Sequence, residues 1–356
     1  METTRYSAGF TIPLLSITVP VIFSSRRTFM LEQSNIIIDV HLNNQDPGAV
    51  KEELRAGLLS RPRRLPTKYF YDDHGSALFE RICAVPEYYP TRTEHQLLKT
   101  VADDVIARTC AEELVELGSG AATKTRVLLD AMARTNRLRF YVPFDFSEGI
   151  VRRVAQELVE EYEGLHVHGV VGDFLTHLEH IPQGGRRLVV FLGGTIGNLG
   201  PEAAPAFLSS VAHEMDPGDF FLLGAQLITD VERLEAAYND SAGLSAAFNK
   251  NILSVLKVVI GAEFDPDNFD HVARFNHDEQ QIEMHLRSVC RQVIPIPELE
   301  LTLRLEGGEE ILTEISTKYT RHHVEVLLAR AGFNPVAWYS DLHDLHGLAL
   351  AQKPSG

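Results

Sequence analysis

Glycine or aspartate residues follow three successive strand-like runs of this sequence. Gly118 and Gly120 end the first run, Asp145 ends the second, and Asp173 ends the third. Ligands of open α/β sheets bind at the carboxyl ends of the strands, and glycine lets the backbone approach a ligand closely. We therefore expect a nucleoside ligand, with Asp145 accepting from both ribose hydroxyls and Asp173 from an adenine amine. For either aspartate taken alone, helix capping is the favoured explanation, and it is the succession of three such strand ends that indicates a ligand.

Two nucleoside ligands compete for this pattern. A dinucleotide fingerprint, G-x-G-x-x-G, needs a third glycine for tight packing of the helix, and Thr123 stands at that position. A pyrophosphate also requires a helix N-terminus left free for its anionic oxygens. S-adenosylmethionine has no phosphate, carries a sulfonium cation and tolerates an acidic pocket. The residues favour S-adenosylmethionine, with a nicotinamide-dependent dehydrogenase as the alternative.

The elements that position these residues alternate between strand and helix from about residue 93. Residues 188–192 are fully apolar, as in a strand buried on both faces of a parallel sheet. Ser147 is a helix N-cap, followed by Ile150, Val154 and Leu158 at four-residue steps. This alternation predicts a doubly wound α/β sheet.

Residues 229–317 interrupt the alternation. They contain helical stretches at 231–238 and 244–256, followed by acidic, strand-like segments such as 310–319. The alternation then resumes with a helix that ends at Gly332 and a closing pair of strands near 337–340 and 348–351. We expect one α/β domain with an insertion, against which residues 31–91 pack.

Composition narrows the class of protein. The 356 residues contain 33 Lys and Arg against 49 Asp and Glu, a net charge of −16, which argues against a nucleic-acid partner. Cys83, Cys110 and Cys290 are odd in number and widely spaced, so neither a disulfide framework nor a metal site is expected. This pattern fits a reducing compartment, and we expect a cytoplasmic protein with no membrane association.

The N-terminus contains an apolar run at residues 10–23 that resembles the core of a signal peptide. Pro13 and Pro20 interrupt this run, no small-residue cleavage site follows, and its length is too short to span a bilayer as a helix. We therefore expect residues 1–40 to be a disordered N-terminal extension.

Several long motifs resemble the histidine-specific S-adenosylmethionine-dependent N-α-methyltransferase family of ergothioneine biosynthesis. The likeness covers residues 40–353, almost the whole chain. The motifs are LPTKYFYDDHGSALFERI (65–82), PEYYPTRTE (86–94), ELGSGAATKTRVLLDAM (116–132), FLGGTIGNLGPE (191–202), AAYNDSAGLSAAFNKNIL (236–253), FNHDEQQIEMHL (275–286) and LTEISTKY (312–319).

The resemblance implies a fold and a domain division. The fold is a class I, Rossmann-like methyltransferase domain with a second α+β domain specific to the family. By this analogy, residues 92–228 and 318–356 form the S-adenosylmethionine-binding domain. Residues 41–91 and 229–317 form the substrate-binding domain.

The resemblance also implies the site residues. Those for the methyl donor S-adenosylmethionine are Gly118, Lys124, Asp145, Asp173 and Phe174. Those for the substrate are Tyr71, Tyr88, Asn198, Tyr238, Met284, Glu314 and Ser316. Asn198 and Tyr71 are the candidates that act on the substrate amine, whereas the hydroxyls of Tyr88 and Tyr238 are expected to bind its carboxylate.

Residues 310–319 alternate like a strand, which gives this substrate set a physical interpretation. Leu312, Glu314, Ser316 and Lys318 are expected on one face. An imidazole between Glu314 and Ser316 could donate an N–H to the carboxylate and pair its other nitrogen with the hydroxyl. Without the family likeness, a solvent-facing polar strand edge explains the same residues.

The family converts free L-histidine to hercynine by three successive methylations of the α-amine. We expect this activity here, by a monomer that needs no metal. An N-methyltransferase of another free amino acid, such as tryptophan, is the alternative within the class, although Met284 and Glu314 favour histidine. A non-catalytic S-adenosylmethionine-binding or scaffold protein is the alternative outside the class.

Overall fold

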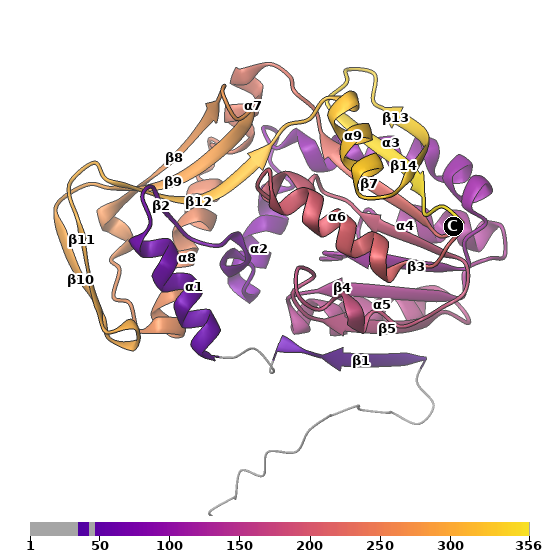
Figure 1. Ribbon diagram of the computed structural model, residues 1–356, viewed down its shortest axis with the longest axis horizontal. Helices are drawn as coiled ribbons and strands as arrows, with labels where there is room; N and C mark the ends of the chain where they lie inside the picture. The colour runs from indigo at the N-terminus through magenta and orange to yellow at the C-terminus, as the bar shows by residue number, and fades with distance from the viewer. Residues whose placement is uncertain (1–34, 43–46, 356) are drawn as a thin grey trace, which may run out of the picture.

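The computed structural model describes residues 35–42 and 47–355 and contains an eight-stranded sheet (Figure 1). Neighbouring strands are parallel from β1 to β7, and β14 is antiparallel to both of its neighbours. The spatial order is β1 (Ile36–Val40), β5 (His166–Val171), β4 (Phe140–Asp145), β3 (Glu113–Leu117), β6 (Arg187–Phe191), β7 (Phe220–Gln226), β14 (His346–Gln352) and β13 (Asn334–Ser340).

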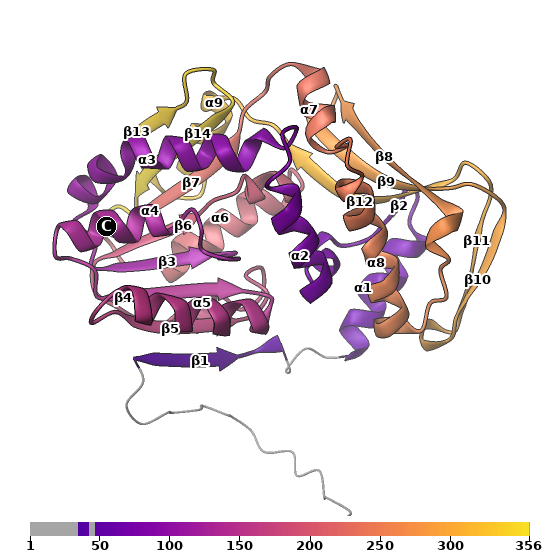
Figure 2. The ribbon, with the colours of Figure 1, turned by 180° about the vertical axis from the view of Figure 1, so that it is seen from behind.

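Helices cover both faces of this sheet. One face is covered by α3 (Tyr89–Thr109), α4 (Arg126–Arg134) and α5 (Glu148–Glu161), seen in front in Figure 2. The other face is covered by α6 (Ala203–Glu214) and α9 (Arg321–Arg330), seen in front in Figure 1. The alternation expected from the sequence is confirmed as a doubly wound sheet.

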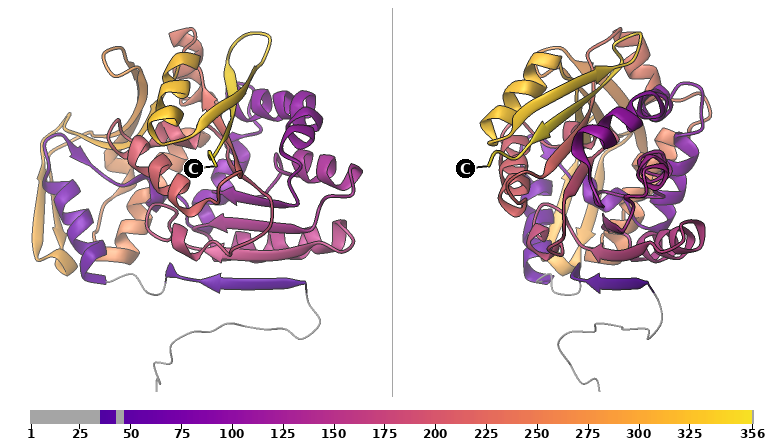
Figure 3. Two further views of the ribbon diagram at one scale, coloured as in Figure 1. Left: turned by 45° about the vertical axis from the view of Figure 1, so that its right-hand side comes forward. Right: turned by 90° about the vertical axis from the view of Figure 1, so that its right-hand side faces the viewer.

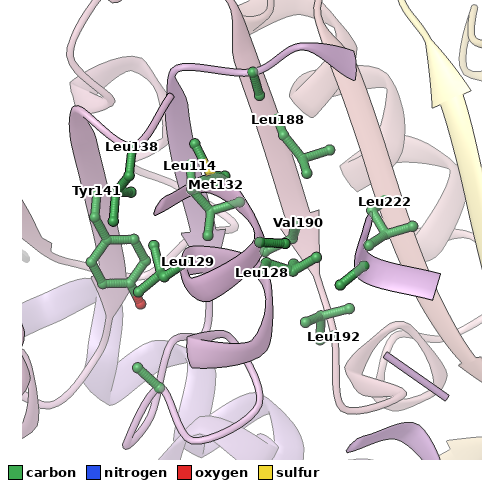
Figure 4. Packing of buried hydrophobic residues seen from close by; sticks show 14 of the residues in the cluster. Leu114, Leu128, Leu129, Met132, Leu138, Tyr141, Leu188, Val190, Leu192 and Leu222 are labelled. Atoms are coloured by element: carbon green, nitrogen blue, oxygen red, sulfur yellow. The ribbon is translucent and has the colours of Figure 1, made fainter. Parts of the chain in front are cut away.

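The packing of α4 shows what stabilises this arrangement. Leu128, Leu129 and Met132 lie on the buried side of α4 and pack against Leu114 and Val190 of the sheet (Figure 4). All five side chains are fully buried. Burial of each contributes about 1.5–3 kcal/mol relative to exposure, so this apolar stripe fixes the helix that follows the glycine turn.

Local signals set the ends of the elements. The Ser147 hydroxyl accepts from the Ile150 amide at 3.4 Å and caps α5, as expected. Gly332 follows α9 with a φ of +91°, a conformation that glycine adopts without strain. The two closing strands are also confirmed, because β13 and β14 pair with each other.

A second region is built from two chain segments that interrupt the large sheet's sequence, one between β1 and β3 and one between β7 and β13. Its four-stranded sheet has the order β2 (Arg63–Arg64), β12 (Glu310–Thr317), β9 (Gln281–Ser288) and β8 (Phe269–Asn276). A separate hairpin contains β10 (Gln292–Ile296) and β11 (Leu301–Leu305). The helices are α1 (Pro47–Leu59), α2 (Asp73–Ile82), α7 (Val231–Ala237) and α8 (Leu244–Ile260).

This region has a hydrophobic core of its own. Phe70 from the first segment and Ile252, Phe269 and Ile311 from the interruption are fully buried in one cluster. Phe70 packs on Phe248 of α8, with ring centroids 4.7 Å apart. The part of the N-terminal segment that contains Phe70 therefore packs against the insertion, whereas residues 36–40, which we expected to pack there too, join the large sheet.

The start of the described chain differs from expectation. Residues 36–40, predicted to be disordered as part of the 1–40 extension, form the edge strand β1 beside β5 (Figure 3). This part of the prediction is wrong because the apolar run Ile36-Ile37-Ile38 pairs with a parallel neighbour, and Ile38 is buried. The apolar run at 10–23 lies outside the described residues. Within the described ranges, none of the helices is long and apolar enough to cross a membrane.

Candidate active site

The turn after β3 brings backbone and carboxylate together. Gly118 and Gly120 have φ values of +71° and +48°, in the left-handed region that favours glycine. The Gly118 amide donates to Phe144 O at 2.7 Å, and the Gly120 amide donates to Asp145 Oδ2 at 2.8 Å. The glycine turn is thereby held against the end of the neighbouring strand β4.

The two aspartates lie at adjacent strand ends. Asp145 Oδ1 also accepts from the Ser147 amide at 3.0 Å, and burial raises the pKa of this carboxyl although backbone amides oppose the change. Asp173 Oδ1 accepts from the Leu175 amide at 3.0 Å, while its Oδ2 lies 3.4 Å from Lys68 Nζ. Both carboxylates therefore stabilise local turns, and both also line the carboxyl edge of the sheet.

An aromatic wall closes the same edge. A β-carbon built on Gly118 would lie 3.8 Å from the Phe174 ring. Phe174 packs edge-on against Phe191, with ring centroids 5.4 Å apart. This edge offers open backbone, carboxylates and an apolar ring, which suit a nucleoside that carries hydroxyls, an amine and a flat base.

Lys124 lies between this edge and the next loop. It forms an ion pair with Glu94, which is fully buried in the first turns of α3. Glu94 also accepts from the Gly193 amide and from His346 Nε2, each at 2.9 Å. Burial alone would raise the pKa of Glu94, but Lys124 and His346 outweigh it and hold the pKa well below its usual range.

The loop after β6 carries Asn198 to the small sheet. A β-carbon on Gly197 would lie 2.6 Å from Thr317 O, so the loop approaches β12 as closely as a glycine allows. Asn198 Nδ2 donates to Ile315 O at 3.1 Å. The loop and β12 thus contact each other directly. Beside them, Leu227 after β7 forms a bridge with Tyr319 after β12.

This close approach makes a testable prediction. Gly197→Ala places a methyl group against backbone, which cannot swing aside as a long side chain would. We expect a roughly tenfold rise in the substrate KM, because displacement of the loop moves Asn198, and little change in the affinity for S-adenosylhomocysteine. Gly200→Ala is the matched control, since nothing lies within 4 Å of a β-carbon there. An unchanged KM in Gly197→Ala contradicts the role given to this contact.

A β-bulge in β12 aims the polar face of the strand. The pairing with β9 shifts between Leu312, which lies opposite His285, and Glu314, which lies opposite Met284. Leu312 therefore does not share a face with Glu314, and that part of the predicted alternation is wrong. The extra residue, Thr313, donates to Asn249 Oδ1 of α8 at 2.7 Å. Bulges of this kind re-aim side chains next to functional sites.

Glu314, Ser316 and Lys318 are all buried beyond the bulge, with exposures of 9%, 2% and 1%. The interpretation of this strand as a solvent-facing edge is therefore wrong. Burial raises the pKa of Glu314 to about 7, and the Asn198 side chain and the Lys318 charge oppose that rise. Met284 lies directly across the strand pair from Glu314 and supplies an apolar wall.

The Ser316 hydroxyl lies in a compact hydrogen-bonded group. Tyr238 donates to it at 2.8 Å, and Lys318 Nζ donates to it at 2.6 Å. Lys318 Nζ also lies 2.7 Å from Gln226 Oε1 at the end of β7 and 3.0 Å from the Tyr238 hydroxyl. Ser316 is thus fixed in orientation by Tyr238 and Lys318, and Gln226 of the large sheet in turn holds Lys318.

Tyr71 and Tyr88 complete a group of side chains that we call the substrate cluster, whose other members are Asn198, Tyr238, Met284, Glu314 and Ser316. The Tyr88 ring packs edge-on against Tyr238, with centroids 6.1 Å apart, and Tyr71 packs edge-on against Phe248 at 5.8 Å. Burial raises the pKa of Tyr71 well above its usual range, with Glu314 and Asp145 as further contributors. Tyr71 is thus within electrostatic range of both carboxylates, and its phenol stays protonated.

Comparisons with known proteins agree with this geometry. The model of the family described as "Histidine-specific methyltransferase, SAM-dependent" matches residues 50–353. The chain belongs to this family. The fold is accordingly that of a class I S-adenosylmethionine-dependent methyltransferase with an additional β-sheet region, and S-adenosylmethionine is the methyl donor.

Three relatives of this methyltransferase are informative. The histidine N-alpha-methyltransferase of Mycolicibacterium smegmatis is 48% identical, covering 86% of this chain and 95% of that protein. The enzyme of the same name from Mycobacterium tuberculosis is 45% identical over the same shares. The 4-dimethylallyltryptophan N-methyltransferase of Claviceps purpurea is 29% identical, covering 50% and 53%.

The structure brings the predicted residues into two adjoining groups. Gly118, Asp145, Asp173 and Phe174 line the nucleoside edge, with Lys124 beside them and paired to Glu94. The substrate candidates form the second group. They are Tyr71, Tyr88, Asn198, Tyr238, Met284, Glu314 and Ser316.

Sequence reasoning missed four side chains that hold these groups in place. Glu94 lies within the PTRTE motif, and Lys318 was placed on the Glu314 face without a role. His346 and Gln226 stand at the ends of strands, and nothing local marks His346 as functional. A buried-strand pattern that ends in a polar residue, as at Gln226, is the one usable signal.

Proposed function

We propose that this methyltransferase transfers methyl groups from S-adenosylmethionine to the α-amine of free L-histidine, three times in succession, giving hercynine. The observation that carries this proposal is the buried Glu314–Ser316 pair, which is joined to Asn198 and the tyrosines at the carboxyl edge of the large sheet. The two mycobacterial relatives named above support it.

Recognition of the ring rests on two polar partners with different capacities. A Glu314 carboxylate only accepts hydrogen bonds, and Ser316 can donate one. An imidazole with one N–H and one bare nitrogen satisfies both at once. A phenyl ring would leave both partners buried and unpaired, at a cost of roughly 1–3 kcal/mol each.

The amine is proposed to lie near Asn198 and Tyr71. Tyr71 is within electrostatic range of both Glu314 and Asp145, which supports a position near the donor bound at the nucleoside edge. We propose that Tyr88 binds the α-carboxylate. Tyr238, expected to share that role, directs its hydroxyl at Ser316, so we propose that it orients the ring-binding serine.

The residues of the chain contribute to catalysis mainly by positioning the amine nitrogen close to the methyl carbon. The amine must be neutral when it attacks, and a site that holds nitrogen and carbon within roughly 3–3.5 Å supplies most of the acceleration. S-adenosylmethionine supplies an electrophilic methyl group on its sulfonium. Gly118, Lys124, Asp145, Asp173 and Phe174 are proposed to hold it. Tyrosine hydroxyls near the amine can exchange hydrogen-bond partners as N–H donors disappear over three rounds.

The domain division follows from the same assignment. We propose that residues 92–228 and 318–356 bind the donor, and that residues 41–91 and 229–317 bind the amino acid. We also propose that the active species is a monomer.

Product masses test the proposal directly. Purified protein is incubated with S-adenosylmethionine and each of the twenty amino acids in turn. We expect a gain of three methyl groups on histidine alone. Tryptophan is the second candidate, because the Claviceps relative is named for a tryptophan derivative. Methylation of tryptophan without histidine would overturn the proposal.

A further inference from the structure

Lys318 is buried at the inner end of the substrate cluster. Its side chain is 1% exposed, and its Nζ lies 2.6–3.0 Å from three oxygens, those of Gln226, Tyr238 and Ser316. An ammonium has three donors and no acceptor. These three contacts therefore use its whole hydrogen-bonding capacity.

The contact with Lys318 also limits the hydrogen bonds that Ser316 can make. Its oxygen accepts from Lys318 at 2.6 Å and from Tyr238 at 2.8 Å. The Tyr238 hydroxyl also lies 3.4 Å from Gln226 Oε1, and we assign its single hydrogen to the shorter contact with Ser316. A hydroxyl has two acceptor lone pairs and one hydrogen to donate. With both lone pairs taken, the hydroxyl hydrogen is what Ser316 has left to offer to a further partner.

We propose that Lys318 is a positioning residue that makes Ser316 an obligate donor, so that the pocket binds only the neutral imidazole, in the tautomer whose N–H faces Glu314. This inference rests on the proposed function. An imidazolium carries N–H on both nitrogens, and one of these would point at a serine that cannot accept. Leaving such a buried donor unpaired is expected to weaken binding roughly tenfold or more.

The charges around Lys318 agree with this assignment. Glu314 on the same strand and Tyr238 at the end of α7 are the titratable groups that face it, and Gln226 of β7 is neutral. Burial lowers the pKa of Lys318 to about 7, and Glu314 opposes that change. The lysine is therefore cationic over the acidic range in which an imidazole, with a pKa of about 6.5, takes up its proton.

The test compares histidine with 3-(1,2,4-triazol-3-yl)alanine, whose ring offers a donor and an acceptor and stays neutral in this range. Both dissociation constants are measured by calorimetry with S-adenosylhomocysteine bound. From about pH 7.5 to about pH 5.5, histidine binding is expected to weaken about tenfold more than triazole binding, because about one tenth of the imidazole stays neutral. Titration of Glu314 affects both ligands and cancels in the ratio.

Two variants each remove one hydrogen-bond donor from Ser316. Lys318→Met and the nearly isosteric Tyr238→Phe each free one lone pair of Ser316, so each is expected to bring the histidine-to-triazole ratio to within about twofold of its neutral-pH value. In a Ser316→Ala background, Lys318→Met is expected to change the ratio no further. Affinity for S-adenosylhomocysteine shows that each variant is folded.

Opposite results are equally informative. The inference is wrong if folded Lys318→Met or Tyr238→Phe keeps the wild-type ratio, if wild type binds no triazole, or if Lys318→Met acts equally without Ser316. If Lys318→Met does not fold, Tyr238→Phe decides alone. A wild-type protein that neither binds nor methylates histidine would instead refute the proposed function.

Discussion

Replacing Glu314 with alanine is expected to raise the dissociation constant for histidine by roughly 10- to 100-fold, the value of a hydrogen bond to a buried charged group. The reason is that the carboxylate is the pocket's acceptor for the ring N–H, and Ser316 has its lone pairs occupied. Affinity for S-adenosylmethionine should change by less than about twofold, because Glu314 lies on β12 and not at the nucleoside edge. Calorimetry with each ligand separately measures both.

Glu310→Ala is the matched control. Glu310 belongs to the same strand, and it forms ion pairs with Arg274 and Arg287, each at 2.8 Å, away from the substrate cluster. Its loss should leave histidine binding unchanged. An equal loss of histidine and S-adenosylmethionine affinity in Glu314→Ala would contradict the assigned role.

The same residue gives histidine binding a pH dependence. Burial raises the pKa of Glu314 to about 7, so the carboxyl is protonated below that pH and loses its role as the acceptor. Histidine affinity is therefore expected to rise as the pH increases through about 7. This component should be absent in Glu314→Ala and present in Glu310→Ala.

Much of the large sheet is predictable from the sequence because its signals are local. The apolar strand β6, the Ser147 cap and the glycines after β3 and α9 each act over a few residues. The nucleoside edge follows from them, since parallel strands place their carboxyl ends together. Asp145 and Asp173 therefore meet at one edge as expected.

The substrate cluster is less predictable because it depends on long-range packing. The bulge at Thr313 is stabilised by Asn249 of α8, and no strand pattern reveals it. A simple alternation that ignores the bulge places Leu312 on the same face as Glu314, which is wrong. Lys318 looks like an ordinary polar residue at a strand end until Gln226 and Tyr238 are brought to it.

The buried group around Glu94 illustrates the same limit. Its partners Lys124, Gly193 and His346 are separated from it by 30, 99 and 252 residues. Each is unremarkable in its own segment. Only the assembled sheet places β14 next to β7 and so brings His346 to the helix that carries Glu94.

Asp145→Asn is expected to lower the affinity for both S-adenosylmethionine and S-adenosylhomocysteine by roughly 10- to 100-fold, as for loss of a charged acceptor. The carboxylate accepts from Gly120 and Ser147 and, as we propose, from the ribose hydroxyls. An asparagine has one acceptor oxygen, so it cannot serve both backbone amides and the ligand. Calorimetry with S-adenosylhomocysteine gives the affinity without turnover.

Asp130→Asn is the control for this change. Asp130 is exposed on α4 and accepts from the Tyr162 hydroxyl at 2.8 Å. Its replacement should leave affinity for S-adenosylhomocysteine within about twofold of wild type. If Asp145→Asn also binds normally while its thermal unfolding temperature falls, the carboxylate serves only to cap the turn, and the ribose contact must be assigned to another residue.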